Sequence, residues 1–164
     1  MPRPQSSDLS QRLYRSALHH LARHGYAACK LAAITLEAKT SKQAIYRRWP
    51  HGKQQLAIEA LRFGFSRVPY QAAGSASFDE ELDTSYAALQ HALTHTPLGL
   101  AYLTCLGTQE LRPTCQLLLA EQRIFFRQIY LYWGRSHIME AEISQRLSRV
   151  FFQCILEPAI EQQS

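Results

Sequence analysis

The sequence predicts an all-α fold, and three observations support that prediction. Apolar residues recur at spacings of three and four in every long segment, which is the pattern of amphipathic helices. No segment shows the strict alternation of a half-buried strand over a useful length, and no internal repeat is evident. Gly and Pro residues stand between the periodic segments, where helices have to end.

Four helices are predicted in the N-terminal part of the chain. Asp8 begins the first, with Gln11 three residues later in the manner of a capping box, and Gly25 ends it. The next two helices are short and flank a three-residue turn around Lys39. The predicted spans are about 8–25, 30–37, 41–48 and 53–68.

A linker is predicted between the two parts of the chain. Pro69 and the Ala/Gly/Ser run at 72–77 form the only clear stretch of turn residues between periodic segments. We place a domain boundary there, which gives an N-terminal domain of residues 1–68 and a C-terminal domain of residues 69–164. Helices of the second domain are predicted over about 79–95, 97–108, 110–133 and 140–162.

The second and third predicted helices have the layout of a helix-turn-helix unit. Ile45 and Trp49 are four apart on the third helix and can pack against the apolar side of the second, so Trp49 is predicted to be a core residue. The remaining positions of the third helix are rich in cations. In a helix-turn-helix unit that binds DNA, this second helix of the pair enters the major groove. The polar and basic positions outside the apolar set are Lys42, Gln43, Arg47 and Arg48.

The net charge of the chain is divided unevenly. The whole chain carries +5, but residues 1–68 contain 12 Lys/Arg and 3 Asp/Glu, a balance of +9, against 6 and 10 in residues 69–164, a balance of −4. A basic surface binds phosphates with release of counterions, so double-stranded DNA is the predicted partner. The alternative is a solvated basic face that serves only solubility.

A specific motif ends the third helix. Tyr46-Arg47 is followed by Trp49-Pro50 and then by Lys53, in the order Tyr-Arg-x-aromatic-Pro-x-x-Lys, and His-Gly-Tyr stands at 24–26. With these residues the chain resembles, over roughly 9–68, the tetracycline-repressor (TetR) family of transcriptional regulators. The resemblance implies a three-helix helix-turn-helix DNA-binding domain joined by a fourth helix to a helical ligand-binding and dimerisation domain.

Two positions depart from the family pattern. Lys39 stands where family members usually have Gly in the turn, and a left-handed conformation there costs a non-Gly residue roughly 1 kcal/mol. A cation close to a DNA phosphate is our hypothesis for the compensation. Cys29 stands where the family tends to have a Thr that caps the second helix, and a thiol is a poor cap.

The DNA-binding residues are predicted from the helix layout and from the resemblance. Lys42 can reach a base edge or a phosphate, and Gln43 can hydrogen-bond an adenine edge. Alternatively, Gln43 closes a capping box with Thr40; a cap at Ser41 instead would free it. The resemblance implies a phosphate contact for Tyr46. Arg47 and Lys53 are also predicted to contact phosphates, Lys53 because it begins the fourth helix, where the helix dipole favours an anion. The complete predicted set is Lys39, Ser41, Lys42, Gln43, Tyr46, Arg47 and Lys53.

A palindromic operator and a homodimer are implied together. One recognition helix contacts too few base pairs to specify a unique DNA site, so such proteins bind two half-sites as a two-fold dimer. The resemblance implies that the last two helices pair with those of a second subunit. The alternative is that both helices simply form the core of the single chain. The predicted dimer residues are Ile129, Leu147, Phe151 and Ile155.

The resemblance also implies an effector site in the C-terminal domain for a small molecule, whose identity the sequence does not indicate. Tyr86, Tyr102 and Phe125 are predicted to line it, although aromatic residues at helical spacing are more often plain core. The domain is short for the family, so a small pocket or none is the alternative.

No metal site or cofactor is predicted. His20/His24 and His91/His95 are each four apart on a helix, but the sequence brings no third ligand to either pair, so they are interpreted as exposed helical histidines. A metal- or thiol-sensing role that involves the second pair or Cys105 is the minor alternative. The four cysteines show no paired spacing and are interpreted as reduced core thiols.

Other classes of protein are disfavoured. The chain lacks a nucleophile elbow, a phosphate-binding Gly-rich loop and a His-Glu-x-x-His motif, so no enzyme is predicted. No apolar run approaches the roughly 20 residues of a membrane span, and no secretory signal is evident, so the prediction is cytoplasmic. The predicted function is a repressor that a small-molecule inducer releases from DNA. The alternative is a TetR-fold interaction protein, or a DNA-binding regulator that no longer senses a ligand.

Overall fold

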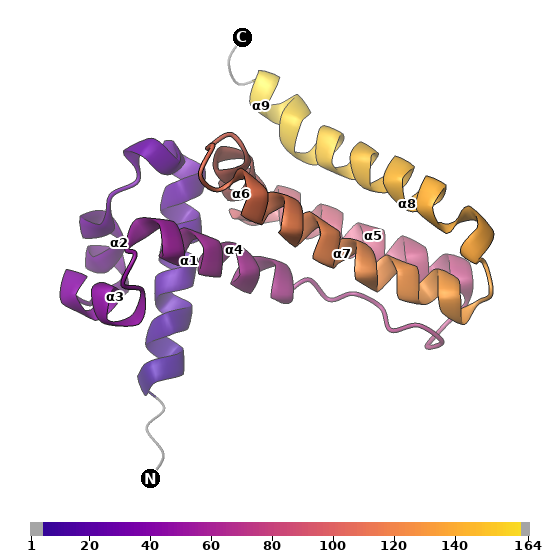
Figure 1. Cartoon of the computed structure of the whole chain (residues 1–164), viewed down its shortest axis with the longest axis horizontal. Helices are drawn as coiled ribbons and strands as arrows, with labels where there is room; N and C mark the ends of the chain where they lie inside the picture. Colours follow the sequence, from indigo (N-terminus) through magenta and orange to yellow (C-terminus); the bar gives the residue numbers. More distant parts are fainter. Residues whose placement is uncertain (1–4, 162–164) are drawn as a thin grey trace.

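The computed structural model describes residues 5–161 and confirms the all-α prediction: this part of the chain is helical, without strands. Two predicted bounds were wrong, because the first helix starts before Asp8 and the last before residue 140. Figure 1 shows α2 and α3 at one end and the long helices α5, α7 and α8 running side by side away from them. The helices are α1 (Gln5–Ala28), α2 (Leu31–Ala38), α3 (Lys42–Arg48), α4 (Lys53–Ser66), α5 (Phe78–His95), α6 (Leu98–Leu106), α7 (Arg112–Tyr132), α8 (Ser136–Phe151), the π-helix η1 (Phe152–Leu156) and α9 (Glu157–Glu161).

Helix α1 is packed on two sides. It contacts α2 and α4 within the N-terminal part and α6 of the C-terminal part. Leu13, Ala17 and Leu21 of its apolar stripe are at most 1% exposed. The burial of such side chains contributes about 1.5–3 kcal/mol each for the larger ones. The two predicted domains therefore share a buried helix.

The backbone of α1 breaks at Gly25, where the helix was predicted to end. Gly25 has φ 77 and ψ 164, a conformation that the absence of a Cβ permits, and one further turn follows to Ala28. The break turns the Tyr26 N–H out of the helix, and it donates to Thr104 Oγ1 of α6 at 2.8 Å. An added Cβ at Gly25 would lie 3.3 Å from the same oxygen. The break thus fastens the end of α1 to α6.

The predicted linker is attached along its length to the C-terminal helices. The Tyr70 ring stacks on Phe125 with centroids 4.8 Å apart, and the Tyr70 hydroxyl donates to Gln122 Oε1 at 2.9 Å. The Ala76 N–H donates to the buried Glu81 carboxylate at 3.0 Å. These contacts leave little freedom to the segment that joins α4 to α5.

The last helix continues through a π-turn. Helix α8 runs into η1 and then α9, and Pro158 lies in the turn after η1. Proline has no N–H to offer the carbonyl of Cys154, and its ring crowds that carbonyl. The wider π-turn over Phe152–Leu156 separates the two groups, which explains why the helix continues past Pro158.

We expect Thr104→Val to lower the free energy of unfolding by roughly 1–2 kcal/mol, because the Tyr26 N–H loses its acceptor in a partly buried position. Urea-induced unfolding measures the loss. Thr94→Val is the matched control, since the Thr94 hydroxyl bonds only within the exposed end of α5. Equal stability of the two variants would contradict the fastening of α1 to α6.

Candidate nucleic-acid interface

The turn between α2 and α3 is set by Lys39. This residue has φ 56 and ψ 54, and it is the only non-Gly residue with positive φ in the described part of the chain. The Lys39 N–H donates to Leu36 O at 3.3 Å and the Thr40 N–H to Thr35 O at 2.9 Å. The pair of bonds is a Schellman motif, which satisfies the last carbonyls of α2. The left-handed conformation expected from the sequence is therefore present.

Helix α3 is capped by Ser41. The Ser41 hydroxyl accepts the Ala44 N–H at 3.2 Å, and Ser41 itself is extended. Of the two caps that the sequence allowed, the structure has the one at Ser41 rather than Thr40. The exposed Gln43 side chain consequently takes no part in the cap.

Helix α3 buries one side and exposes the other. Ile45 is fully buried and Trp49 is 5% exposed, with its ring 5.6 Å from that of Tyr14 in an edge-on contact. The predicted core role of Trp49 is therefore confirmed. The side chains on the other side are exposed, namely Lys42, Gln43, Tyr46 and Arg47.

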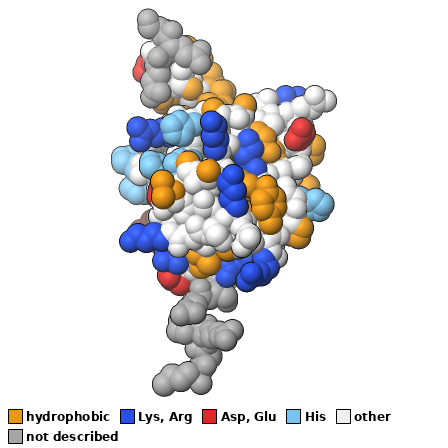
Figure 2. Space-filling view, turned by 90° about the vertical axis from the view of Figure 1, so that its left-hand side faces the viewer, with side chains coloured by type: hydrophobic (Ala, Val, Ile, Leu, Met, Phe, Trp, Pro, Cys, Tyr) orange, Lys and Arg blue, Asp and Glu red, His pale blue; other side chains and the backbone are white. Residues whose placement is uncertain are grey.

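The surface seen from the end where α2 and α3 lie is basic. Figure 2 shows several Lys and Arg side chains spread over this face, with acidic side chains few and at its edges. Arg48, which the sequence grouped with the cations, is half-buried, and its Nη1 is buried without a hydrogen-bond partner among the described residues. It is therefore less accessible than Arg47.

Lys53 has partners inside the chain. Its Nζ donates to Tyr26 O at 2.7 Å and to Cys29 O at 3.2 Å, and it lies 4.4 Å from the centre of the Tyr26 ring. A lysine at the last carbonyls of a helix also suits the negative end of the helix dipole. The sequence predicted a phosphate contact for Lys53 from its place at the start of α4. The structure gives it a second task, the fixing of α4 to the end of α1.

The start of α2 has no side-chain cap. The residue before the helix is Lys30, which makes no side-chain cap, and Cys29 is buried at 3% exposure. Burial raises the pKa of the Cys29 thiol, and the nearby Lys53 opposes that shift. Cys29 is a core residue rather than a helix cap.

Comparison with known proteins bears on the same segment. A family model described as "Bacterial regulatory proteins, tetR family" matches residues 13–60, which run from α1 to α4. This segment is a tetR-type helix-turn-helix domain. The match supports a DNA-binding transcriptional regulator of the tetR family, with the helix-turn-helix unit of α2 and α3 as its DNA-binding part. No curated protein matches the sequence.

The three aromatic residues predicted to line an effector pocket do not share one cavity: Phe125 lines a cavity of about 330 Å³ beside the linker, whereas the other two are packed in the core. Tyr86 is 4% exposed and stacks on Phe126 at 4.1 Å, and the buried Tyr102 hydroxyl donates to Cys115 O at 3.1 Å. Phe125 is 46% exposed on the surface of α7. The first two fill the core, which is the alternative that the sequence left open.

A cavity of about 590 Å³ lies elsewhere, where the N-terminal and C-terminal helices meet. Sequence reasoning missed it because its lining comes from four separate elements. Gly64 allows α4 to approach α6, since an added Cβ there would lie 2.6 Å from Leu98 Cδ1. The lining residues are Arg15, Leu18, Phe63, Gly64, Arg67, Pro69, Ala88, His91, Ala92, Thr96, Pro97 and Leu98.

Most of the predicted dimer residues lie in the core of the single chain. Ile129, Leu147 and Ile155 are at most 2% exposed, and half-buried Phe151 has its ring 5.4 Å from that of Tyr102. Helices α5, α7 and α8 pack on one another and use up this apolar stripe. The exposed apolar residues of the last helices are others, and they include Leu117, Ile124, Leu131, Phe152 and Leu156.

The second histidine pair and the four cysteines were the minor candidates for a sensing site. The His91 and His95 rings stack at 4.6 Å, and neither belongs to a metal-ligand group of three among the described residues. All four cysteines are free and buried, and burial raises the pKa of Cys105 to about 12 and that of Cys115 to about 11. Thiols held protonated in this way react slowly with oxidants.

Within the described range, no helix is long and apolar enough to cross a membrane.

We expect Lys53→Met to lower the free energy of unfolding by roughly 1–2 kcal/mol, because the carbonyls of Tyr26 and Cys29 lose a charged donor while the aliphatic stem remains. Thermal unfolding of this variant is to be compared with that of Lys42→Met, whose exposed lysine has no such partners. A variant with unchanged stability but weaker DNA binding would assign Lys53 to phosphate contact alone.

Proposed function

We propose that this TetR-family regulator is a homodimeric repressor that binds a palindromic operator through α3 and is released by a small apolar anion. The observation that carries the proposal is the exposed polar side of α3, whose opposite side is anchored by Ile45 and Trp49. A helix held in this way can enter the major groove without loss of the core.

The exposed residues of the head, by which we mean the helix-turn-helix unit of α2 and α3, have different expected roles in DNA binding. Lys42 and Gln43, near the N-terminus of α3, are placed to reach base edges, and the cap at Ser41 leaves both of them unengaged. Tyr46 and Arg47 lie on the same exposed side and are proposed to contact phosphates. Lys39 follows α2 directly, where its ammonium can approach a phosphate beside the groove.

The proposed dimer uses exposed apolar side chains of the last helices. Leu117, Ile124 and Leu131 are 59%, 49% and 58% exposed and recur every seven residues along α7, so they lie on one face of that helix. Phe152 and Leu156 add exposed apolar side chains on η1. Such side chains favour contact with a second copy, as the family implies.

The proposed effector site is the cavity between α1, α4, α5 and the start of α6. Its lining is mainly apolar, and Arg15 and Arg67 lie on it with no carboxylate partner in the described part of the chain. Both guanidinium groups lie over the Phe63 ring, at 5.8 and 5.5 Å from its centre. This combination fits an apolar molecule with one negative group. Such a molecule would press between α1, which carries the head, and α5.

A regulator that senses no ligand is the second candidate. The filled interior of the C-terminal helices favours it, since the Tyr86 and Tyr102 side chains occupy the place where a pocket was predicted. The two candidates share the same DNA-binding surface and differ only in the response to an effector.

Selection of bound duplexes from a random library, followed by titrations of the consensus, tests DNA recognition. We expect a palindromic consensus. Lys42→Ala should cost about 1–3 kcal/mol on the preferred sequence and little on others, whereas Arg47→Ala should weaken all sequences and reduce the salt slope by about 1. Arg149→Ala, an exposed arginine of α8, is the control. Recovery of no shared sequence would refute the operator proposal.

Anilinonaphthalene sulfonate, a fluorescent apolar anion, probes the effector cavity. We expect the dye to bind and to weaken operator binding, and Ala88→Phe to abolish both effects, because the new ring fills the cavity. Ala87→Phe places the same ring on the exposed side of α5 and should leave both intact. Dye binding that neither variant changes would remove this cavity from the mechanism, and operator binding that the dye leaves unaltered would favour the second candidate.

A further inference from the structure

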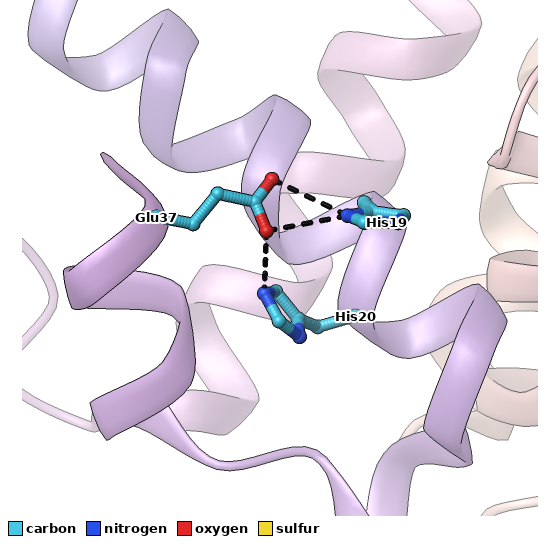
Figure 3. A group of neighbouring side chains, drawn as sticks. All are labelled: His19, His20 and Glu37. Atoms are coloured by element: carbon cyan, nitrogen blue, oxygen red, sulfur yellow. Dashed lines mark hydrogen bonds and ion pairs between the residues drawn. The ribbon is translucent and has the colours of Figure 1, made fainter. Parts of the chain in front are cut away.

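Two histidines of α1 meet a carboxylate of α2 within the helix-turn-helix head. His19 Nδ1 lies 3.3 and 3.2 Å from the two oxygens of Glu37, and His20 Nε2 lies 2.7 Å from Oε2. Figure 3 shows both rings turned toward the carboxylate, with His19 beside it and His20 below it. One potential ligand atom from each residue lies within 4.8 Å of those of the other two. His19 and His20 are adjacent residues of α1, whereas Glu37 comes from α2.

These separations are close to those around a tetrahedral metal ion. Zinc bonds of about 2.0–2.2 Å to nitrogen and oxygen place neighbouring ligand atoms roughly 3.3 Å apart. The His19–Glu37 distances of 3.2 and 3.3 Å already match that spacing, and the 2.7 Å contact of His20 requires a small rotation of the carboxylate. Two imidazoles and one carboxylate form a common zinc ligand set, with water in the fourth position.

The two ring nitrogens of His20 are available to bind a metal ion. Its side chain is 13% exposed, and both ring nitrogens are buried without a well-oriented hydrogen-bond partner in the part of the chain described. The Nε2 atom is close to Glu37, but the direction of the contact is not that of a hydrogen bond. An ion between the two groups would give Nε2 the partner that it lacks. Because no acceptor holds Nδ1, we expect moderate affinity rather than the tight binding of a fully supported ligand.

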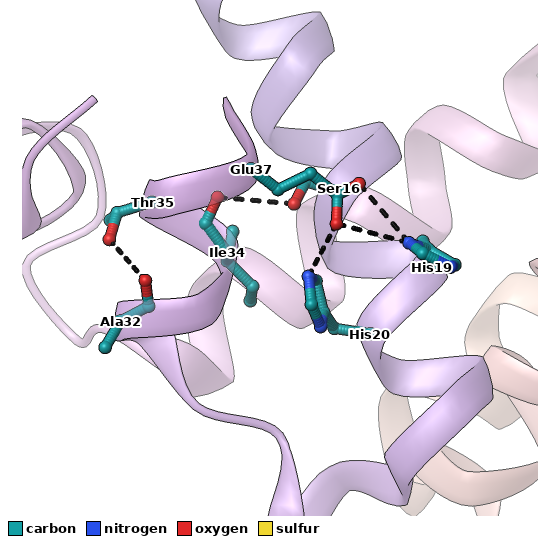
Figure 4. Close-up of polar contacts among 7 residues, drawn as sticks. All are labelled: Ser16, His19, His20, Ala32, Ile34, Thr35 and Glu37. Atoms are coloured by element: carbon teal, nitrogen blue, oxygen red, sulfur yellow. Dashed lines mark hydrogen bonds and ion pairs between the residues drawn. The ribbon is translucent and has the colours of Figure 1, made fainter. Parts of the chain in front are cut away.

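The ligands are held in place by contacts outside the group. The buried Ser16 hydroxyl donates to Ile34 O at 3.3 Å and joins α1 to α2 one turn from Glu37 (Figure 4). Thr35 is tied to its own helix through a bond from its hydroxyl to Ala32 O at 2.9 Å. The helices that carry the three ligands are therefore already packed together without an ion.

We propose that His19, His20 and Glu37 bind a divalent transition-metal ion, with zinc as the representative, and that this ion clamps α2 to α1. The choice of ion class follows from the two imidazole nitrogens, which zinc, nickel and copper prefer and which magnesium and calcium do not. Glu37 stands two residues before Lys39, so the clamp acts directly on the helix that leads into the turn and α3.

The test is zinc binding to the full-length, tag-free chain after removal of metal by a chelator. Calorimetric titration is expected to show one zinc ion per chain, with a rise in the unfolding temperature. Cobalt substitution should give the visible absorption of a tetrahedral nitrogen and oxygen site. Glu37→Gln keeps the size of an exposed side chain and removes its charge, and we expect at least a tenfold weaker affinity. His20→Ala should have the same effect.

His91→Ala is the matched control. The His91 ring stacks on that of His95, as the His20 ring stacks on that of His24, but among the described residues His91 belongs to no comparable group with a carboxylate. Its zinc affinity should equal that of the unmodified chain. The absence of zinc binding at this stoichiometry, or an affinity and thermal shift that survive in Glu37→Gln, would overturn the proposal. In either case the three residues would form only the direct imidazole–carboxylate contacts seen in the structure.

Discussion

The packing of α1 on both the head and the C-terminal helices is the constraint on which the rest of the structure depends. One side of α1 forms the core of the helix-turn-helix domain, and another lies against α6. At Gly25 the backbone breaks so that the Tyr26 N–H reaches Thr104 and the Tyr26 carbonyl accepts from Lys53. These two bonds of Tyr26 fix the orientation of the helix-turn-helix head relative to α4 and α6.

Under the proposed function, this junction would couple a ligand bound by the C-terminal helices to DNA binding. The cavity lies beside the same helices, at the place where Gly64 lets α4 approach Leu98. A ligand there has no need to reshape the interior of the C-terminal helices, which is filled by Tyr86 and Tyr102. Under our proposal it would need only to favour a different separation of α1 and α5, which would move the helix-turn-helix unit with α1. The differential affinity of the ligand for the two arrangements sets the size of the response.

Local patterns predicted what local forces determine. The helix spacing and the core position of Trp49 follow from neighbouring residues. The Gly that the family usually has at position 39 pointed to the left-handed turn, and the family motif added the function. The sequence could not distinguish an apolar stripe that packs in its own chain from one that packs in a partner, and so Ile129 and Leu147 were predicted at a dimer interface. The sequence also did not predict contacts between segments that are far apart along the chain. The meeting of His20 with Glu37 depends on the packing of two helices, which no local spacing encodes.

We expect the helix-turn-helix domain and the C-terminal helices to unfold as one cooperative unit, because both pack on α1. Differential scanning calorimetry of the full-length chain, beside a fragment of residues 1–68, tests it most directly. The full chain should show a single transition with equal calorimetric and van't Hoff enthalpies. The fragment should unfold at a much lower temperature, because the α6-facing side of its α1 is uncovered. Two separate transitions, one of which coincides with that of the fragment, would contradict it.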